Sequence, residues 1–306
     1  MTMRVIKSLF ALFTFLLSFN SLALASSNTI VGLAYDYSSG MGSLYSINPG
    51  ADGSYNSSQW VMQVSSASNP FVLRTGGNRF MALLHDGTLL TKDGTYGNWI
   101  TQTTGVRWAE IASSGEMIII NSAGNVYTKV GTYDPWVQQT SGGGAHDIAI
   151  GGNGRLMVID RDNNAYSKES TYDAWVLQVT GAYLPYIGAN GEMGIIDSAG
   201  NAYTKMSPYD AWVQQTSGGG SLMLAIGGNG RLMVIDRDNN AYSKESTYDA
   251  WVLQVTGAKW IGASATGRLI VDDSSFNLYY KDYTYATWNR IAGPTTDGTL
   301  ATPYIN

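Results

Sequence analysis

Four copies of the phrase Tyr-Asp-x-Trp are the pattern in this chain best suited to bind a ligand. A tyrosine or tryptophan ring can lie against the apolar face of a sugar, while an aspartate accepts hydrogen bonds from hydroxyl groups in fixed directions. A structural role is the competing interpretation, strongest for the tryptophans, because large aromatic side chains mostly serve packing. The predicted ligand-binding residues are Tyr133, Asp134, Trp136, Tyr172, Asp173, Trp175, Tyr209, Asp210, Trp212, Tyr248, Asp249 and Trp251.

Side chains for covalent or metal-assisted catalysis are sparse. The chain has no cysteine, no GxSxG motif, and only His85 and His146 as histidines. The turn 160–164 carries oxygen at alternate positions, but lacks the later glycine and glutamate of a calcium loop. Gly142–Gly144 is not followed by the Lys-Ser/Thr of a phosphate loop. We therefore expect no catalytic residue, no metal and no cofactor. The rival, a lyase or hydrolase, would need His, Glu or a metal at a central channel.

A regular repeat organises the positions of these residues. Tryptophans begin similar phrases at Trp60, Trp99, Trp136, Trp175, Trp212, Trp251 and Trp288, with intervals that alternate between 39 and 37 residues. A period near 40 built from strand-like phrases is typical of propeller blades. The sequence predicts an all-β, seven-bladed β-propeller of four-stranded antiparallel blades.

The unit from Ala149 to Ala182, repeated letter for letter from Ala225 to Ala258, shows the expected strands. Short apolar or alternating runs are separated by turn residues and leave no room for a helix. Asn153-Gly154 predicts a tight hairpin with positive φ at both residues. We expect both faces of the last strand, which begins at Trp175, to be buried. A glutamine follows the tryptophan by three residues in six units, and we expect its amide to hold backbone at the blade edge.

The two ends of the chain complement each other. Only four residues separate Ala25 from the run Ile30–Tyr37, which aligns with the second strand of a blade, so blade one lacks its innermost strand. The end of the chain, 302–306, is similar to the innermost strand 184–188. We expect strand 299–306 to complete blade one and to close the ring. The predicted blades are 26–65 with 299–306, then 66–105, 106–142, 143–181, 182–218, 219–257 and 258–293.

Adjacent antiparallel strands place alternate connections on opposite faces of each blade. The Tyr-Asp loops and the Asn-Gly turns should therefore share one face, with the Asp/Asn turns and glycine connectors on the other. Neighbouring blades would then bring an aromatic ring, a carboxylate and a lysine around each cleft. The lysines are Lys129, Lys168, Lys205 and Lys244.

Residues 1–25 have the layout of a secretory signal peptide. Arg4 and Lys7 precede the apolar run Leu9–Leu17, and Ala23-Leu24-Ala25 offers small residues for cleavage. The run is shorter than the ~20 residues that a membrane anchor needs. We expect cleavage after Ala25 and a secreted or periplasmic protein.

Composition argues against several partners. Removing Arg4 and Lys7 from the 18 basic residues leaves 16 against 23 acidic ones, without a basic cluster. This balance argues against nucleic acid and against anionic membranes. No later stretch is long and apolar enough for membrane insertion. The composition does not indicate an oligomeric state.

Tandem short units with a Trp-Val-x-Gln outer strand and a following glycine resemble tectonins and related bacterial β-propeller lectins. The resemblance covers essentially all of the chain after residue 25, although these units are shorter than those of the family. It implies shallow carbohydrate sites on or between blades. We expect several weak, repeated sites that act together on glycans or glycoconjugates of a surface. A protein-binding scaffold is the alternative, because propellers present broad faces to either kind of partner.

Overall fold

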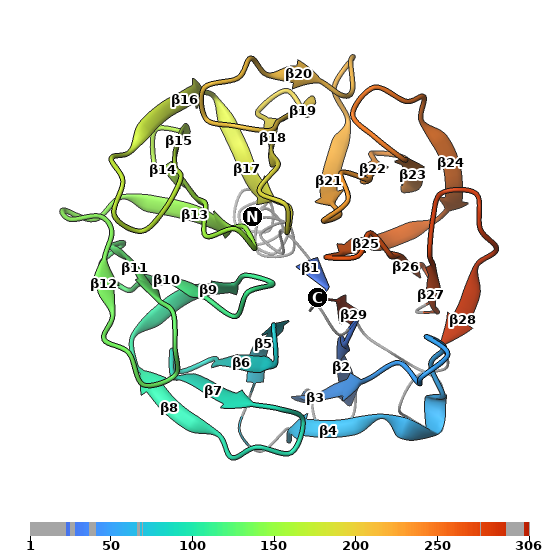
Figure 1. Cartoon of the computed structure of the whole chain (residues 1–306), viewed down its shortest axis with the longest axis horizontal. Coiled ribbons are helices and arrows are strands. Elements are labelled where there is room, and N and C mark those ends of the chain that lie inside the picture. The colour runs from blue at the N-terminus through green and yellow to red at the C-terminus, as the bar shows by residue number, and fades with distance from the viewer. Residues whose placement is uncertain are drawn as a thin grey trace, which may run out of the picture.

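The computed structural model describes residues 23–24, 28–36, 41–65, 68, 70–275, 277–291 and 303–305. Seven sheets stand around a central axis, and each contains four antiparallel strands (Figure 1). The single helical element of these residues is a 3-10 turn, η1 (Ser57–Gln59). The predicted all-β, seven-bladed propeller is confirmed.

The strands of each blade run outward from the axis. Blade one contains β29 (Pro303–Ile305), β2 (Ile30–Asp36), β3 (Met41–Ile47) and β4 (Val61–Val64). Blade two contains β5 (Pro70–Gly76), β6 (Arg79–Leu84), β7 (Leu89–Asp93) and β8 (Ile100–Thr103). Blade three contains β9 (Val106–Ile111), β10 (Met117–Asn121), β11 (Val126–Lys129) and β12 (Val137–Gln138). Blade four contains β13 (Ala145–Ile150), β14 (Leu156–Asp160), β15 (Asn164–Lys168) and β16 (Val176–Thr180).

The last three blades follow the same order. Blade five contains β17 (Ala182–Ile187), β18 (Met193–Asp197), β19 (Ala202–Lys205) and β20 (Val213–Gln214). Blade six contains β21 (Ser221–Ile226), β22 (Leu232–Asp236), β23 (Asn240–Lys244) and β24 (Val252–Thr256). Blade seven contains β25 (Ala258–Ser264), β26 (Leu269–Asp273), β27 (Leu278–Lys281) and β28 (Asn289–Ile291), and β1 (Ala23–Leu24) runs parallel to β25.

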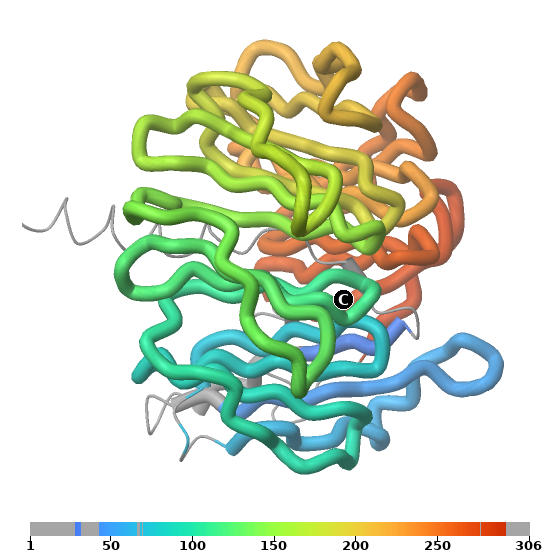
Figure 2. Tube along the Cα trace, turned by 60° about the vertical axis from the view of Figure 1, so that its left-hand side comes forward, coloured from blue at the N-terminus to red at the C-terminus, as the bar shows by residue number. Residues whose placement is uncertain are grey.

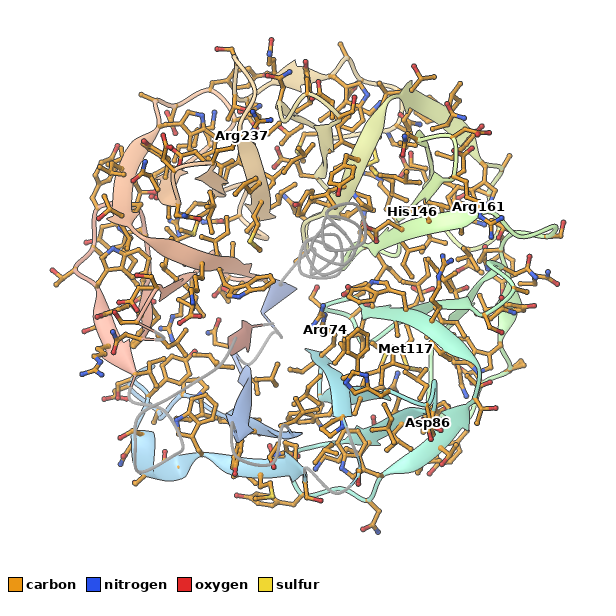
Figure 3. All side chains as sticks on the ribbon, turned by 180° about the vertical axis from the view of Figure 1, so that it is seen from behind. Arg74, Asp86, Met117, His146, Arg161 and Arg237 are labelled. Atoms are coloured by element: carbon orange, nitrogen blue, oxygen red, sulfur yellow. The ribbon has the colours of Figure 1, made fainter. Side chains whose placement is uncertain are left out.

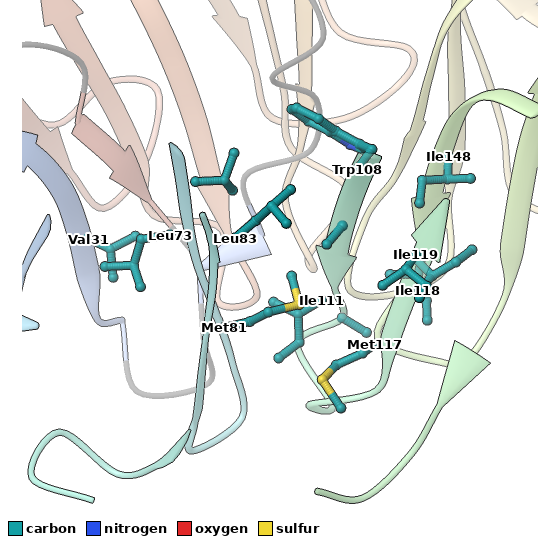
Figure 4. Close-up of a cluster of buried hydrophobic side chains, with 14 of the residues drawn as sticks. Val31, Leu73, Met81, Leu83, Trp108, Ile111, Met117, Ile118, Ile119 and Ile148 are labelled. Carbon is teal, nitrogen blue, oxygen red and sulfur yellow. The ribbon is translucent and has the colours of Figure 1, made fainter. Parts of the chain in front are cut away.

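The inner strands are buried on both faces because each blade lies between two neighbours. Four consecutive apolar residues of β14, Leu156–Ile159, are buried. Figure 4 shows the same packing between blades two and three, where Met81 lies near Ile111 and Met117. With no cysteine in the chain, this apolar burial is the main stabilising contribution, at roughly 25 cal/mol per Å².

The outer strands contradict the expectation that both of their faces are buried. Leu177 of β16 is 53% exposed, and its neighbours Val176 and Gln178 are half-buried. The blades fan out from the axis, so adjacent blades separate toward the rim and leave one face of the outer strand in solvent (Figure 1).

Two kinds of turn join the inner strands. The Asp/Asn turn of blade four uses Asn163 at φ 61°, where blade three has Gly124 at φ 80°. Both positions need the left-handed region, which Gly and Asn tolerate best. The prediction for Asn153-Gly154 is wrong in detail, because only Gly154 has positive φ. The Gly151 amide donates to the carbonyl oxygen of Arg155 at 2.9 Å, so three residues lie between the bonded pair and the loop is longer than a two-residue hairpin.

The C-terminal strand closes the ring, as predicted. In the antiparallel register between β2 and β29, Ile30 pairs with Ile305 and Gly32 pairs with Pro303. Between blades seven and one, Arg268 of blade seven donates to the carbonyl oxygen of Gly53 at 2.8 Å and to the Tyr55 hydroxyl at 3.3 Å. Gly53 and Tyr55 belong to the long loop between β3 and β4, which projects from the molecule in blue (Figure 2).

A lysine, a tryptophan and a glutamine join neighbouring blades, and we call this set the latch. At the junction of blades four and five, the Lys205 ammonium donates to Oε1 of Gln178, and Trp212 Nε1 donates to the Gln178 carbonyl at 3.3 Å. The ammonium also lies 4.6 Å from the centre of the Trp212 ring, a favourable cation–π distance. The lysine–glutamine bond recurs at five junctions, in Lys129–Gln102, Lys168–Gln139, Lys205–Gln178, Lys244–Gln215 and Lys281–Gln254.

A β-bulge explains why the glutamine can serve the next blade. In the ladder between β15 and β16, Ala165 pairs with Val179 and Tyr166 with Leu177, so Gln178 has no cross-strand partner. A bulge leaves its extra residue outside the ladder, and its carbonyl is then free to accept from the neighbouring tryptophan. The Gln178 amide donates to its own strand at Val176, 3.2 Å away. Its predicted role in holding edge backbone is confirmed.

Candidate functional site

The connections divide between two faces, as the alternation of strands predicts. On one face, the loop between β15 and β16 contacts the first hairpin of blade three, where Thr171 donates to Glu116 at 3.1 Å. On the other face, Ser221 at the start of β21 donates to the carbonyl of Gly200 in the turn of blade five, at 2.8 Å. We call these the loop face and the turn face.

The tyrosines of the Tyr-Asp loops extend into solvent. Tyr172 is 87% exposed, and the same position in the other loops is 71–86% exposed, in Tyr96, Tyr133, Tyr209, Tyr248 and Tyr285. Their hydroxyl groups make no hydrogen bond to any residue that the structure describes. Packing therefore does not explain these six side chains, which are available to a partner.

The predicted tryptophans have a different environment. Trp136, Trp175, Trp212 and Trp251 are all half-buried, each with a lysine ammonium 4.6–5.5 Å from its ring centre. Trp175 and Trp251 donate to the glutamine carbonyl of the preceding blade at 3.0 and 2.8 Å. The latch thus occupies one ring face of all four tryptophans and the indole nitrogen of Trp175, Trp212 and Trp251, whereas the buried Nε1 of Trp136 has no partner in the described residues. The main contribution of these tryptophans is to hold blades together.

The four aspartates differ in how their carboxylates are used. Asp134 accepts from the Gly131 amide at 2.7 Å, and Asp173 and Asp249 accept from serine hydroxyls within their own loops at 2.7 and 2.8 Å. The carboxylate of Asp210 makes no hydrogen bond to the described part of the chain. It is the aspartate of this set with both oxygens open to a ligand.

A cleft of about 310 Å³ lies between blades five and six on the loop face. Blade five contributes Glu192, Lys205 and Asp210 to its lining, and blade six contributes Thr247 and Tyr248. The structure therefore combines the aspartate of one loop with the tyrosine of the next. The two residues that the sequence groups within one loop, Tyr209 and Asp210, do not share this cleft.

The charged side chains of the cleft interact mainly with other groups of the protein. Burial raises the pKa of Glu192, opposed by the hydroxyl of Thr247, which donates to it at 2.9 Å. Burial lowers the pKa of Lys205, whereas the negative charge of Asp210 opposes that shift. The lysine is engaged with Gln178 and with the Pro208 carbonyl at 3.0 Å. Asp210 is consequently the principal free acceptor, beside the exposed ring of Tyr248.

The residue at the position of Glu192 divides the junctions into two classes. Blade three has Glu116 there, whereas blades two, four and six have Arg79, Arg155 and Arg231. Arg231 crosses to the carbonyls of Gly267 and Asp282 in blade seven and pairs with Glu245 at 2.5 Å. The arginine junctions are thus filled by an ion pair, whereas the glutamate junctions keep a smaller, hydrogen-bonded side chain.

The predicted tyrosines and aspartates are divided between glutamate junctions and arginine junctions. The junction of blades three and four repeats the cleft residues 76 positions earlier, with Asp134 and Tyr172 in place of Asp210 and Tyr248. The remaining predicted tyrosines and aspartates stand at arginine junctions, and they are Tyr133, Asp173, Tyr209 and Asp249. Glu116 and Glu192 were not among the predicted residues, although their alternation with arginine along the repeats is a signal that could have identified them.

Other kinds of site receive no support from the part of the chain that the structure describes. Within those residues, no three His, Asp or Glu side chains are grouped so that they could hold a metal ion. The described residues also contain no helix with the length and apolar character needed to cross a membrane.

Comparisons with known proteins identify the fold. No protein family profile and no curated protein matches the chain. Among solved structures, it is similar to YCF48 bound to D1 peptide, at 16% identity and a TM-score of 0.51, covering 70% of this chain and 78% of that one. It is also similar to YCF48 from Cyanidioschyzon merolae, at 13% identity and a TM-score of 0.52, covering 73% and 85%.

A third similar structure is PorZ, an essential surface component of the type-IX secretion system of Porphyromonas gingivalis. The identity is 11% and the TM-score 0.59, over 91% of this chain but only 38% of PorZ. At these identities the three matches show the propeller fold alone. None of the three is a tectonin or a lectin by name.

Proposed function

We propose that this chain is a secreted or periplasmic carbohydrate-binding propeller without enzymatic activity, and that the cleft between blades five and six is a glycan site. The observation that supports it best is the pairing of Asp210, whose carboxylate is unoccupied, with Tyr248, which is 85% exposed. A sugar ring would place its apolar face against Tyr248 and direct hydroxyl groups to Asp210. The tectonin-like pattern of the repeats agrees with this function.

The dimensions of the cleft suit a single sugar residue at the end of a glycan. Its volume of about 310 Å³ is at the lower limit of small-ligand pockets. A shallow site of this size gives modest affinity. Asp134 and Tyr172 form the corresponding pair between blades three and four, so one ring would present two sites to a glycan-coated surface. Two linked sites raise avidity by roughly 10² to 10⁴ when geometry permits.

A glycan array followed by calorimetry on the best-binding glycan tests this function. Asp210→Asn should weaken binding at least about tenfold, because a charge-assisted hydrogen bond is lost from the site. Asp249→Asn is the matched control, since Asp249 already bonds to Ser246 at 2.8 Å and faces an arginine junction. Both variants should keep the melting temperature of the parent. Equal affinity in the two variants, or an array without any bound glycan, would contradict the proposal.

A protein partner is the second candidate, and the ring of six exposed tyrosines favours it. Tyrosine is enriched at protein interfaces, and the similar YCF48 structure contains a bound peptide. Pull-down from extracts with and without complete deglycosylation separates the two candidates. Retention that survives deglycosylation supports the protein partner, and retention that disappears supports the glycan.

A further inference from the structure

One position on the turn face holds a different residue in each of blades two to seven. It is a bulge near the start of each innermost strand. In blade four, Ala145 pairs with Asp160 and Asp147 pairs with Ile159, which leaves His146 without a cross-strand partner. The residues at this position in blades two to seven are Phe71, Arg107, His146, Tyr183, Leu222 and Lys259.

This variation occurs within nearly identical surroundings. Blade four from 143 to 181 differs from blade six from 219 to 257 only at positions 145–148, and the bulge residue is one of these four. A bulge re-aims its side chain and is common next to functional sites. The bulge residue therefore varies between blades while the residues around it stay the same. Such variation is typical of a surface that recognises a ligand, and not of a packed core.

Blades three and four bring three basic side chains together at this surface. Arg107 of blade three donates across the junction to the carbonyl of Ala145, and also to that of His146 at 3.5 Å. Ala145 lies opposite Asp160, the residue that precedes Arg161. Figure 3 shows His146 and Arg161 in the same blade, with Arg237, the counterpart of Arg161, in a separate blade.

Neither arginine of this cluster forms an ion pair with a carboxylate of the described residues. Burial and the nearby charge of Arg161 lower the pKa of Arg107, while the buried Asp147 opposes that shift. The Asp160 carboxylate is taken up by backbone amides of its own turn, at 2.9 Å. Two guanidinium groups on neighbouring blades, neither in an ion pair with a described carboxylate, favour an external anion.

We infer that the turn face binds an oxyanion group, a phosphate or a sulfate, between blades three and four through Arg107, Arg161 and His146. Guanidinium groups hold such anions with paired, charge-assisted hydrogen bonds. The corresponding place between blades five and six contains a cleft of about 120 Å³ lined by Tyr183, Leu222 and Arg237. The scaffold thus provides space at this position, and blades three and four supply two further basic side chains there. The site is independent of the glycan cleft, which lies on the opposite face.

Calorimetric titration of the purified protein with sodium sulfate and sodium phosphate tests the site, with sodium chloride at matched ionic strength as the reference. We expect saturable binding of one oxyanion, weakened at least about tenfold by Arg161→Gln. Arg237→Gln, the matched change 76 residues later, should leave the affinity unchanged. Binding no stronger than that of chloride, or equal losses in both variants, would overturn the assignment. The tighter of the two anions indicates which ester group the natural partner carries.

A transplanted site provides a second test that does not depend on loss of function. Tyr183→Arg together with Leu222→His gives blades five and six the basic residues of blades three and four, next to Arg237. The variant should bind two oxyanions in place of one, with an unchanged melting temperature in the absence of anion. A stoichiometry that stays at one in the folded variant would contradict the role of these residues.

Discussion

The junction that closes the ring is held by apolar packing, whereas five junctions within the ring are held by a lysine–glutamine hydrogen bond. Between blades six and seven, Lys281 donates to Gln254, as in the other latches. Between blades seven and one, Ile291 stands at the glutamine position and Ile47 at the lysine position. Both isoleucines are buried in one apolar cluster with Ile30, Ile270, Leu278 and Tyr280.

The two positions change together because each half of a latch requires the other. A buried glutamine oxygen without its lysine would be left unsatisfied, and a buried ammonium without its acceptors would be costly. A polar latch fixes the register of neighbouring blades through directional bonds. At the closing junction the register is instead fixed by strand β29 and by Arg268, so an apolar pair is sufficient there.

Of the changes that test this comparison, removal of residues 299–306 should lower the stability of the fold most. Without β29, strand β2 becomes an open edge and blade one loses the strand nearest the axis. An unpaired inner strand and a broken ring should lower the melting temperature by more than 10 °C, about 3 kcal/mol for a domain of this size. Thermal melts of the truncated and intact proteins check this. An unchanged melt would show that the closing strand is dispensable.

The polar latch should be convertible to the apolar type only if both partners change. Lys244→Ile alone removes the donor, 2.5 Å away, from Oε1 of Gln215 and should cost about 1.5–3 kcal/mol of unfolding free energy. Adding Gln215→Ile recreates the pair found at the closing junction. The loss of unfolding free energy in the double variant should be at least about 1 kcal/mol smaller than the sum of the losses in the two single variants.

The control for this cycle combines Lys244→Ile with Gln102→Ile, from a distant junction. Those two effects should add to within about 0.5 kcal/mol. Urea unfolding of all variants gives the coupling free energy. If the effects of Lys244→Ile and Gln215→Ile also add, the two latch residues contribute to stability separately. The presence of two isoleucines at the closing junction would then need another explanation.

The fold was predictable because its determinants are local and repeated. The seven tryptophans set the number of blades, and the match between 302–306 and 184–188 indicated the closing strand. The exposure of Leu177 was not predictable from β16 alone, because it depends on how far neighbouring blades diverge. The positive φ at Asn163 followed from residue type, whereas the turn at Asn153-Gly154 depended on the loop length that the strands allow.

Part of the lining of the candidate cleft was predictable from the sequence, but Glu192 and the grouping of the residues were not. Tyr248 and Asp210 were both expected to contact a ligand, and they line one cleft although they belong to different loops. A single repeat cannot show which side chains face the neighbouring repeat. For the same reason Trp175 was grouped with the ligand contacts, although its indole nitrogen bonds to Gln139 of the preceding blade.

A buried carboxyl in blade seven offers a smaller test, with a pH dependence. Asp272 is 1% exposed, neither of its oxygens has a hydrogen-bond partner in the described residues, and blades four and six have Ile159 and Ile235 at its position. Burial, together with the charge of Asp273, raises its pKa to about 8. Asp272→Ile should increase the free energy of unfolding by about 1–3 kcal/mol at pH 7.

The sign of the pH effect follows from the raised pKa. Between pH 4 and 8 the carboxyl is ionised in the unfolded chain but protonated in the fold, so its contribution to stability falls as pH rises and levels off above pH 8. The gain from Asp272→Ile should therefore grow from pH 4 to 8. Unfolding curves across this range check it, with the exposed Asp162→Asn as a control. A gain that does not vary with pH would contradict the buried, protonated state.

The smallest effect on stability is expected at the rim of the loop face. Tyr248 is 85% exposed and Tyr285, one blade on, is 71% exposed, so truncation of either to alanine removes little packing. Each variant should remain within about 0.5 kcal/mol of the parent, a shift in melting temperature below about 2 °C. Only Tyr248→Ala should weaken glycan binding, because Tyr285 stands at the junction that Arg231 crosses to reach Asp282. Calorimetry and melts on the two variants separate a binding role from a structural one. A large loss of stability at Tyr248, or equal losses of binding at both positions, would mean that the loop tyrosines serve the fold as the latch does.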